Sequence, residues 1–187
     1  TGAPLRGISC HLGGSSSVTG ILNGAAIGTS MGMSPQSGLP QNNRVGDLDA
    51  EAVHYAVKTF GISIEEAQRQ LSKESGLKGL SCVSNDIREV QAEAAKGHAS
   101  AQMAIDVFIA SARHWIGSYF FELNGADAIV FTAGIGENRP ELREAICANL
   151  DQLGIVLDAA KNNSTKAQEA VISAANSRVK VLVIPTN

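Results

Sequence analysis

Short apolar runs separated by turn-forming residues mark the N-terminal part of the chain. Runs of β-type composition cover residues 7–12, 16–22 and 25–31, and Asn23-Gly24 stands between the last two. An Asn-Gly pair between such runs is the strongest short-range signal of a β-hairpin, because both residues tolerate a positive φ. We therefore expect strands joined in hairpins here.

The pattern then changes from polar to helical. Residues 33–48 are rich in Pro, Gly, Asn, Gln and Ser, a composition that favours a long loop. From Asp49 onward the apolar period is helical, and Gly61 is placed to end this helix. The expected apolar face of the helix consists of Val53, Ala56, Val57 and Phe60.

More helices are expected in the middle of the chain. Ser63 and Glu66 form a capping box, in which each side chain satisfies an orphan backbone donor at a helix start. A short helix follows Ser84. The clearest helix covers residues 100–123, whose apolar side chains recur three or four positions apart until Asn124-Gly125 ends it.

Strands and helices alternate in the C-terminal part. Residues 128–132 resemble a buried strand, 134–136 a tight glycine turn, and the next helix is expected over 138–150, with Asn138 and Glu141 in capping positions. This order of elements predicts an α/β fold, a mixed sheet with helices packed against it, in a single domain. The remaining expected elements are an apolar run at 154–157, a helix at 165–176 and a strand at 179–184.

Composition narrows the class of protein. The chain has 44% apolar and 18% charged residues and a net charge of -3, so it has no electrostatic preference for nucleic acid. No apolar stretch approaches the ~20 residues of a membrane span, and no signal peptide opens the chain. Three cysteines without metal-like spacing indicate reduced thiols in the core of a cytoplasmic protein.

Both ends of the chain look cut. Thr1 is not a methionine, and Asn187 directly follows the last expected strand. Natural domains more often finish in a polar tail or a docked helix. We therefore expect these 187 residues to be part of a longer protein.

The first candidate for chemistry is the string from His11 to Ser17, which lies between two β-type runs. Glycines at Gly13 and Gly14 let backbone N–H groups approach phosphate oxygens, and the hydroxyl of Ser15 adds a donor. The same string also fits a Gly/Ser hairpin turn without a ligand.

The second candidate is the string from Phe131 to Asn138, at the end of a buried strand, where open α/β sheets bind ligands. Its glycines permit close backbone approach, and a following helix N-terminus offers N–H groups to an anion or a ribose. Glycines that only form the turn are the alternative. A dinucleotide-binding fold is a weaker rival, because Asp158 is suitably placed for a ribose but the third glycine is missing.

Two further candidates lie between these strings. Arg44 ends the long polar loop, and its planar fork suits a transferring phosphoryl group; pairing with Asp47 or Asp49 is the alternative. Asp86 stands at a helix start, where capping alone explains it. The other histidines, which share no metal-ligand spacing and are expected to be structural or solvated, are His54, His98 and His114.

Taken in order, these strings resemble the acetate kinase family. That family carries HLGNGSS, TSMGFTPLEGL, a TRSGDIDP-like segment, SGxSxDxR and FTAGIGEN. The counterparts here are residues 11–17, 29–39, 43–49, 81–88 and 131–138. Five motifs in matching order are far more specific than any one of them, and they cover nearly the whole chain.

The resemblance implies a ribonuclease-H-like domain of the superfamily of acetate and sugar kinases, actin and heat-shock chaperone ATPases. The chain would be the C-terminal nucleotide-binding domain, over residues 1–187. Arg44 would be the transition-state arginine. The implied nucleotide-binding residues are His11, Leu12 and Gly13 on the phosphates, Asp86, Ile87 and Arg88 at the adenosine pocket, and Gly134, Ile135, Gly136, Glu137 and Asn138 on a second adenosine-side loop.

The implied reaction is reversible transfer of the ATP γ-phosphoryl group to acetate with Mg²⁺, and propionate or butyrate are alternative acceptors. No metal ligand is expected in this chain. A noncatalytic nucleotide-binding or dimerisation module is the other alternative, since family members form homodimers through this domain. The sequence departs from the family at Gly14 and Ser15, which stay in the phosphate loop on the glycine and hydroxyl argument alone, and at residues 40–43 before Arg44.

Overall fold

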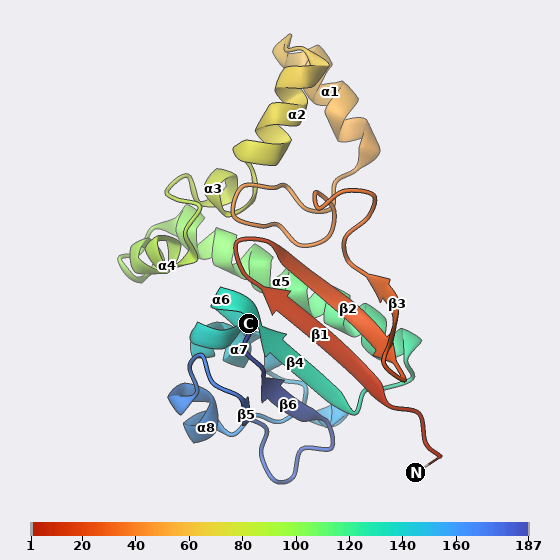
Figure 1. Cartoon of the computed structure of the whole chain (residues 1–187). Coiled ribbons are helices and arrows are strands. Elements are labelled where there is room, and N and C mark those ends of the chain that lie inside the picture. The colour runs from red at the N-terminus through yellow and green to blue at the C-terminus, as the bar shows by residue number, and fades with distance from the viewer. Residues whose placement is uncertain (1, 187) are drawn as a thin grey trace. The chain divides into compact units, whose positions relative to one another are not determined.

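The computed structural model describes residues 2–186, and its strands form one mixed sheet (Figure 1). The strand order is β3-β2-β1-β4-β6-β5. The pairs β1/β2, β2/β3 and β5/β6 are antiparallel, whereas β1/β4 and β4/β6 are parallel. The mixed α/β architecture expected from the sequence is therefore confirmed. The strands are β1 (Arg6–Leu12), β2 (Ser16–Leu22), β3 (Ala25–Thr29), β4 (Ala128–Thr132), β5 (Ala170–Val171) and β6 (Lys180–Val183).

The chain divides into two compact units, each treated by itself below. The sheet unit contains the residues up to Ser30 and those from Ile109 onward, and the helical unit is Met31–Phe108. The expectation of a single domain stays a prediction. The helices are α1 (Ala50–Phe60), α2 (Ile64–Lys73), α3 (Gly76–Ser81), α4 (Ile87–Ala95), α5 (Ala99–Glu122), α6 (Ala133–Asn138), α7 (Pro140–Cys147) and α8 (Ala159–Ser164), with a 3₁₀ turn at Asp151–Leu153. None of the helices within residues 2–186 is long and apolar enough to cross a membrane.

The predicted hairpins are present. Asn23 and Gly24 join β2 to β3 with φ values of 53° and 83°, so both residues of the turn use the left-handed region. The side chain of Asn23 also accepts a hydrogen bond from the N–H of Leu5 at 2.9 Å. The hairpin predicted from Asn23-Gly24 is therefore confirmed, and the Asn23 side chain also ties the turn to the chain before β1.

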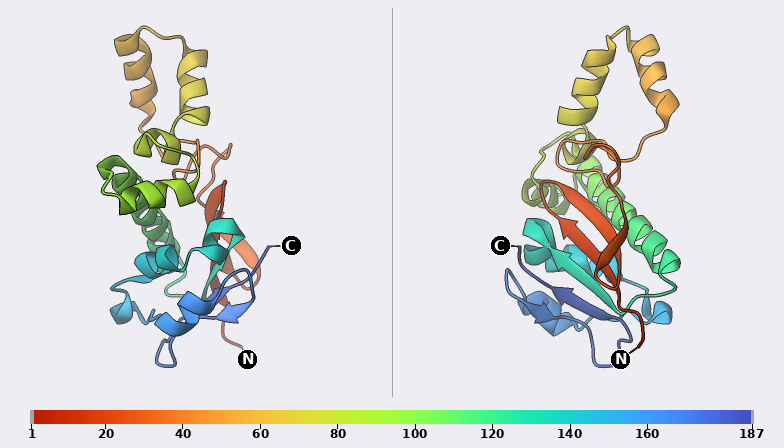
Figure 2. Two further views of the ribbon diagram at one scale, coloured as in Figure 1. Left: turned by 90° about the vertical axis from the view of Figure 1, so that its left-hand side faces the viewer. Right: turned by 45° about the vertical axis from the view of Figure 1, so that its right-hand side comes forward.

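The part of α5 that belongs to the sheet unit, from Ile109 onward, packs on one face of the sheet. Ile8 and Cys10 alternate with half-buried neighbours along β1, as period-2 burial requires. Gly20 is opposite Ile8 in the ladder, and a Cβ on Gly20 would lie 2.6 Å from Cδ1 of Tyr119. The absence of a side chain at Gly20 thus lets the C-terminal half of α5 lie directly on the strands (Figure 2).

The expected glycine turn after β4 is wrong, because the chain enters a helix at once. Ala133 has φ 65° and turns the corner, so Gly134 and Gly136 remain in α6. The break falls at Arg139, since a residue before proline disfavours the helical region and Pro140 suits the first position of α7. The expected helix over 138–150 therefore spans only Pro140–Cys147, and the capping role expected for Asn138 is not found.

The expected helix at 165–176 is also wrong. α8 ends with Thr165 as its C-cap, and Ala167 adopts φ 46°, which interrupts any helix. Ala170–Val171 instead pairs with β6 as an edge strand. The expected run at 154–157 contributes one bridge, Leu157 to Ser173. Apolar spacing compatible with a helix was overridden by pairing to the sheet.

The cysteines divide into two environments. Cys10 and Cys147 are buried, and burial raises the pKa of both thiols, that of Cys147 to about 12. Cys82 is exposed, because it caps the C-terminus of α3 with φ 55°. The expectation that all three cysteines lie in the core is therefore wrong for Cys82, and α3 itself was not expected from the sequence.

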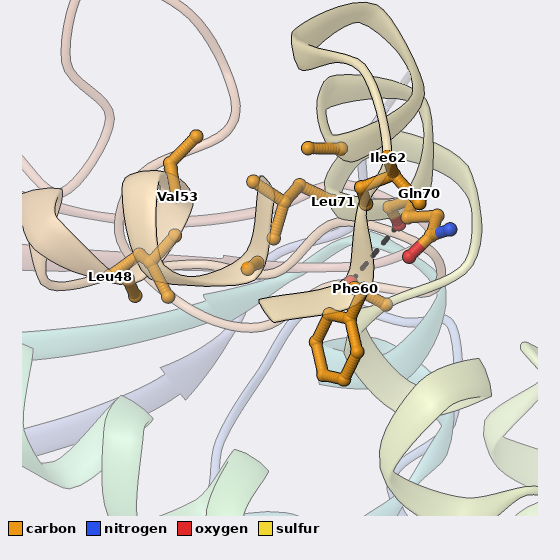
Figure 3. A pocket seen from close by; sticks show the side chains of 10 residues that line it. Leu48, Val53, Phe60, Ile62, Gln70 and Leu71 are labelled. Carbon is orange, nitrogen blue, oxygen red and sulfur yellow. Dashed lines mark hydrogen bonds between the residues drawn. The ribbon is translucent and has the colours of Figure 1, made fainter. Parts of the chain in front are cut away.

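Helices α1 and α2 lie side by side in the helical unit (Figure 2), and side chains from both line an apolar hollow (Figure 3). Gly61 ends α1 with φ 63°, as predicted, and Asp49 caps its start. No residue of α1 is buried, and Phe60 is 69% exposed. Of the expected apolar face, Val53, Ala56 and Phe60 line an open hollow of about 240 Å³.

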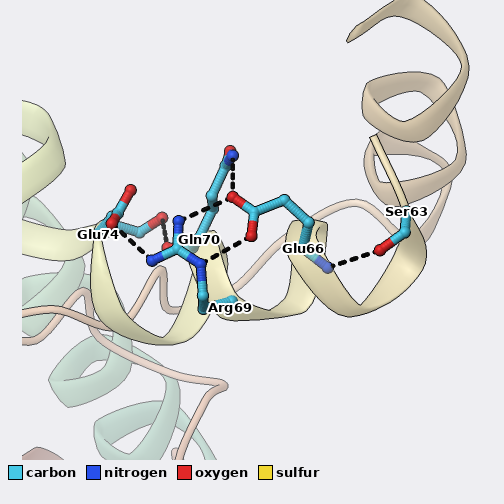
Figure 4. A network of polar contacts seen from close by, with 6 residues as sticks. Ser63, Glu66, Arg69, Gln70 and Glu74 are labelled. Atoms are coloured by element: carbon cyan, nitrogen blue, oxygen red, sulfur yellow. Dashed lines mark hydrogen bonds and ion pairs between the residues drawn. The ribbon is translucent and has the colours of Figure 1, made fainter. Parts of the chain in front are cut away.

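A network of hydrogen bonds and ion pairs lies on the surface of α2 and connects side chains along the helix (Figure 4). The Oγ of Ser63 accepts from the N–H of Glu66 at 3.2 Å, which is half of the predicted capping box. The carboxylate of Glu66 accepts two bonds from Arg69 at 2.7 Å each and one from Gln70 at 2.9 Å. These bonds, with that of Arg69 first, lower the pKa of Glu66 to about 2.

Candidate functional site

The first glycine string forms the connection between β1 and β2. His11 and Leu12 end β1, and the N–H of Gly13 donates to the carbonyl of Ser15 at 3.1 Å and to Oγ of Ser16 at 3.2 Å. The fully buried Ser16 hydroxyl in turn donates to the Gly13 carbonyl. Ser16 was not among the expected site residues. Its two hydrogen bonds with the Gly13 backbone close the loop from inside, and we call this pair of bonds the Ser16 clamp.

The exposed part of this connection is small. Gly13 is buried, whereas Gly14 and Ser15 are exposed. Ser16 therefore fixes the base of the loop and leaves its tip at the surface. A tip built from glycine and serine presents backbone to a ligand without a Cβ in the way.

The second glycine string lies against the first. In the parallel ladder His11 is opposite Thr132, so β1 and β4 end at the same edge of the sheet. A Cβ on Gly13 would lie 3.3 Å from Cβ of Ala133 and 3.9 Å from the nitrogen of Gly134. The structure thus brings residues 11–15 and the start of α6 together at the carboxyl edge, where open α/β sheets bind ligands.

The residues of α6 face in two directions. Gly134 and Asn138 are exposed, and Nδ2 of Asn138 donates to the Gly134 carbonyl at 3.1 Å. Ile135 and Gly136 are buried, and a Cβ on Gly136 would lie 3.4 Å from the carbonyl carbon of Phe131. The lack of a side chain therefore serves a different purpose at each glycine. At Gly136 it permits packing on the strand, and at Gly134 it leaves the helix surface open.

Glu137 is the acidic residue of α6, and it is only 7% exposed. Its Oε1 accepts from the N–H of Thr186 at 3.0 Å and from the hydroxyl of Thr186 at 3.2 Å. This carboxylate ties α6 to the chain after β6, which sequence reasoning had not anticipated. Nothing in the residue spacing relates positions 137 and 186.

Arg44 is half-buried in the helical unit at the end of the polar loop. Its Nη1 donates to Oε1 of the fully buried Gln41 at 2.9 Å, and Nε2 of Gln41 donates to the carbonyl of Pro35 at 2.7 Å. Gly76 makes this packing possible, because its ideal Cβ would lie 2.0 Å from the Gln41 carbonyl oxygen. The loop is therefore ordered by its own side chains.

Asp47 and Asp49, the alternative partners of Arg44, both accept from backbone groups. Oδ1 of Asp47 accepts from the N–H of Gly38 at 2.8 Å, and Oδ1 of Asp49 accepts from that of Glu51 at 2.9 Å. Each carboxylate thus shapes one end of the segment that carries Arg44.

The fourth candidate lies at the start of α4, also in the helical unit. Oδ1 of Asp86 accepts from the N–H of Arg88 at 2.9 Å, so the capping interpretation is confirmed. The guanidinium of Arg88 also pairs with the Asp86 carboxylate, which raises the pKa of Arg88. Ile87 is buried in the core of the unit, whereas Arg88 is exposed.

After β4 the structure does not contain the glycine turn that a dinucleotide-binding fold requires. Gly134 and Gly136 lie within a helix and form no strand-to-helix turn. Asp158 caps α8 by accepting from the N–H of Lys161 at 3.1 Å. Within residues 2–186, no group of three or more acidic, histidine or cysteine side chains is placed to hold a metal ion.

Comparison with known proteins identifies the family. The model of the acetokinase family matches residues 2–187. The chain belongs to this family. It is 44% identical over 183 residues to an acetate kinase of Heliobacterium modesticaldum, and this alignment covers 98% of this chain and 46% of that protein. Acetate kinase 2 of Clostridium perfringens is 45% identical, with the same coverage of 98% and 46%.

Solved structures agree with this assignment. An acetate kinase of Porphyromonas gingivalis superposes with a TM-score of 0.95 at 34% identity, over 98% of this chain and 46% of that one. A propionate kinase of Francisella tularensis superposes with a TM-score of 0.90 at 39% identity, over 98% and 46%. The chain thus has the ribonuclease-H-like fold of acetokinases, and it spans about half the length of the relatives it matches.

Proposed function

We propose that the chain is the nucleotide-binding half of an enzyme that transfers the γ-phosphoryl group of ATP to acetate. The products are acetyl phosphate and ADP, and the reaction is reversible. The observation that carries the proposal is the contact between the β1–β2 loop and the start of α6, in a member of the acetokinase family. Catalysis in such a site depends mainly on positioning and on neutralisation of charge.

The β1–β2 loop is proposed to hold the phosphates. His11, Leu12 and Gly13 shape the base of the loop, and the exposed tip at Gly14 and Ser15 presents backbone to phosphate oxygens. The rigid Ser16 clamp supports this role, because a preorganised loop loses little freedom when an anion binds.

In the sheet unit α6 is proposed as a contact of the nucleotide, and in the helical unit the start of α4 is proposed as another contact. On α6, the exposed Gly134 and Asn138 are suited to contact, whereas Ile135, Gly136 and Glu137 act by fixing the helix. On α4, the exposed Arg88 is available to a ligand, and Asp86 orients it. Ile87 is limited to backbone contact because its side chain is core.

Arg44 is proposed to stabilise the transition state. A guanidinium binds two phosphoryl oxygens at once, and charge on the transferring group spreads over its equatorial oxygens. The bond from Nη1 to the buried Gln41 orients the fork before substrate arrives. Gln41 belongs to the segment that departs from the family pattern, and its buried amide supports the arginine.

Magnesium is proposed to enter with the nucleotide. Mg²⁺ would neutralise charge on the nucleotide phosphates, and it needs only one or two protein carboxylates. No residue of this chain is assigned as a metal ligand in this proposal.

Two alternatives have specific support. The similarity to a propionate kinase favours a slightly longer acyl substrate as second candidate. Exposed apolar side chains on α5 favour a homodimer, and a noncatalytic dimerisation module is the other class of function. The exposed residues in question are Met103, Val107 and Phe121.

The test is calorimetric titration of this chain with Mg-ADP, beside an assay of the complete natural reading frame that contains it. We expect saturable ADP binding by both proteins and acyl phosphate formation by the complete frame, with acetate preferred over propionate and butyrate. Propionate preference would move the assignment within the family. Self-association without ADP binding or kinase activity would establish the noncatalytic module and overturn the kinase proposal.

A further inference from the structure

Arg143 of α7 is a completely buried arginine in the sheet unit. Its relative exposure is 0%, and it is the largest fully buried side chain of the described residues. It is not one of the proposed nucleotide contacts, and it belongs to α7, the helix that follows α6 in the chain. A buried guanidinium without a catalytic role requires a physical explanation.

All five N–H donors of this guanidinium have acceptors. Nη1 donates to the carbonyls of Gly136 and Glu137 at 2.8 and 2.9 Å. Nη2 donates to the carbonyls of Asn162 and Thr165 at 2.8 and 2.9 Å, and Nε donates to Oδ1 of Asn162 at 2.8 Å. One side chain thus joins the C-terminal end of α6 to that of α8.

The groups that accept these hydrogen bonds from Arg143 are all neutral, so no hydrogen-bonded carboxylate compensates for the burial of its charge. Burial lowers the pKa of Arg143, although arginine stays charged in proteins. The carbonyls at the ends of α6 and α8 carry the negative ends of two helix dipoles, which partly offset the desolvation of the cation. Well-packed apolar residues often replace buried charges without loss of stability, so stability alone does not explain this arginine.

Geometry gives the better explanation. α6 has six residues, no side-chain cap at Thr132 and a break at Arg139, and helices this short do not hold their shape alone. The planar fork of Arg143 fixes its last carbonyls, while Glu137 ties it to Thr186. Both links act on the helix that presents Gly134 beside the β1–β2 loop.

We propose that Arg143 is a positioning residue for the nucleotide, which acts by holding α6 in register with the β1–β2 loop. The inference rests on the proposed function of that site. Lysine cannot replace this arginine, because one ammonium group cannot bond the ends of two helices through a planar fork. The positioning role therefore predicts a binding defect even for a charge-conserving substitution.

The experiment compares R143K, R143M and R6M in the complete natural reading frame. Arg6 is the matched control: its guanidinium also binds a backbone carbonyl, that of Asn124, together with the carboxylate of Asp127, but it stands at the opposite end of β1. For each variant we measure the Kd of ADP, the KM values of ATP and of the carboxylate substrate, the melting temperature, and amide hydrogen exchange.

We expect both Arg143 variants to raise the Kd of ADP and the KM of ATP about tenfold or more, since small misplacements of binding groups weaken sites strongly. The KM of the carboxylate substrate should stay unchanged, and exchange should increase over residues 134–138. R6M should lower the melting temperature without changing the Kd of ADP. R143K decides the matter if R143M does not fold.

Unchanged ADP binding by R143K would overturn the inference, as would equal losses of affinity in R143K and R6M at equal losses of stability. If the wild-type protein binds no ADP, the proposed function fails, and the nucleotide part of this inference fails with it. Hydrogen exchange separates these failures, because it reports whether Arg143 holds α6 whether or not a nucleotide binds.

Discussion

At the scale of single residues, the glycines of α6 illustrate how one sequence motif combines two physical demands. Gly136 faces β4, where a Cβ would be 3.4 Å from a backbone carbon. A Cβ on Gly134 would have no atom within 4 Å outside its own helix and neighbours. Replacing Gly136 therefore tests packing, whereas replacing Gly134 tests the proposed ligand surface alone.

This difference leads to the first prediction, for Gly134→Leu. The fold should be retained or gain up to about 1 kcal/mol, because glycine is a poor helix residue. ADP affinity should fall at least about tenfold, because the new side chain fills the surface beside the phosphate loop. Gly117→Leu is the matched control, since Gly117 is an exposed helical glycine of α5 with equal room. Equal ADP affinity of the two variants, by calorimetry, would contradict the proposed site.

At the scale of elements, the contact between α5 and the strands depends on missing side chains. Gly20→Ala would place a methyl group 2.6 Å from the Tyr119 ring. We expect this overpacking to lower the free energy of unfolding by about 1–3 kcal/mol in urea denaturation. Gly7→Ala is the control, because its Cβ would meet only Ile21 at 3.8 Å. Comparable losses in both variants would show that strand propensity, and not the Tyr119 contact, sets the effect.

The network on α2 predicts a dependence of stability on pH. Hydrogen bonds from Arg69 lower the pKa of Glu66 from 4.5 to about 2. The contribution of a lowered carboxyl pKa is present above the unfolded value and is lost as pH falls through the folded value. Stability should therefore decrease between pH 4.5 and about 2, and Glu66→Gln should reduce that decrease. The measurement is the free energy of unfolding at several pH values in this range. The same dependence on pH in the wild-type protein and in Glu66→Gln would contradict the prediction. The effect is small, since the pair is exposed.

The elements also show which features were predictable from sequence. Asn23-Gly24 and Gly61 encode their conformations locally, because the required left-handed backbone is available to few residue types. The helix expected at 165–176 failed because its apolar spacing suited a helix, while its final structure depends on β6. The site motifs were recognised as strings, but the buried links of Glu137 and Arg143 depend on long-range contacts that no local pattern records.

At the scale of the whole molecule, the chain covers 46% of the length of its relatives, so the proposed reaction also requires residues outside it. Exposed Phe121, at 86%, is suited to an interface between copies. We predict a homodimer of the complete reading frame, and a shift toward monomer in Phe121→Glu by sedimentation. Met33→Glu is the control, because Met33 is also fully exposed but lies in the polar loop. A monomeric wild-type protein would contradict this prediction.

The parallel pairing of β1 with β4 has a consequence for biosynthesis. Arg6 and Asp127, which bond at the start of these strands, are 121 residues apart in the chain. At about 5–20 residues per second, a ribosome needs several seconds to deliver β4 after β1. During that interval the hairpin of β1 and β2 lacks its partner strand β4, and the apolar side of β1 is uncovered. High contact order of this kind slows folding, so we expect this hairpin to remain open to chaperone binding until β4 is delivered.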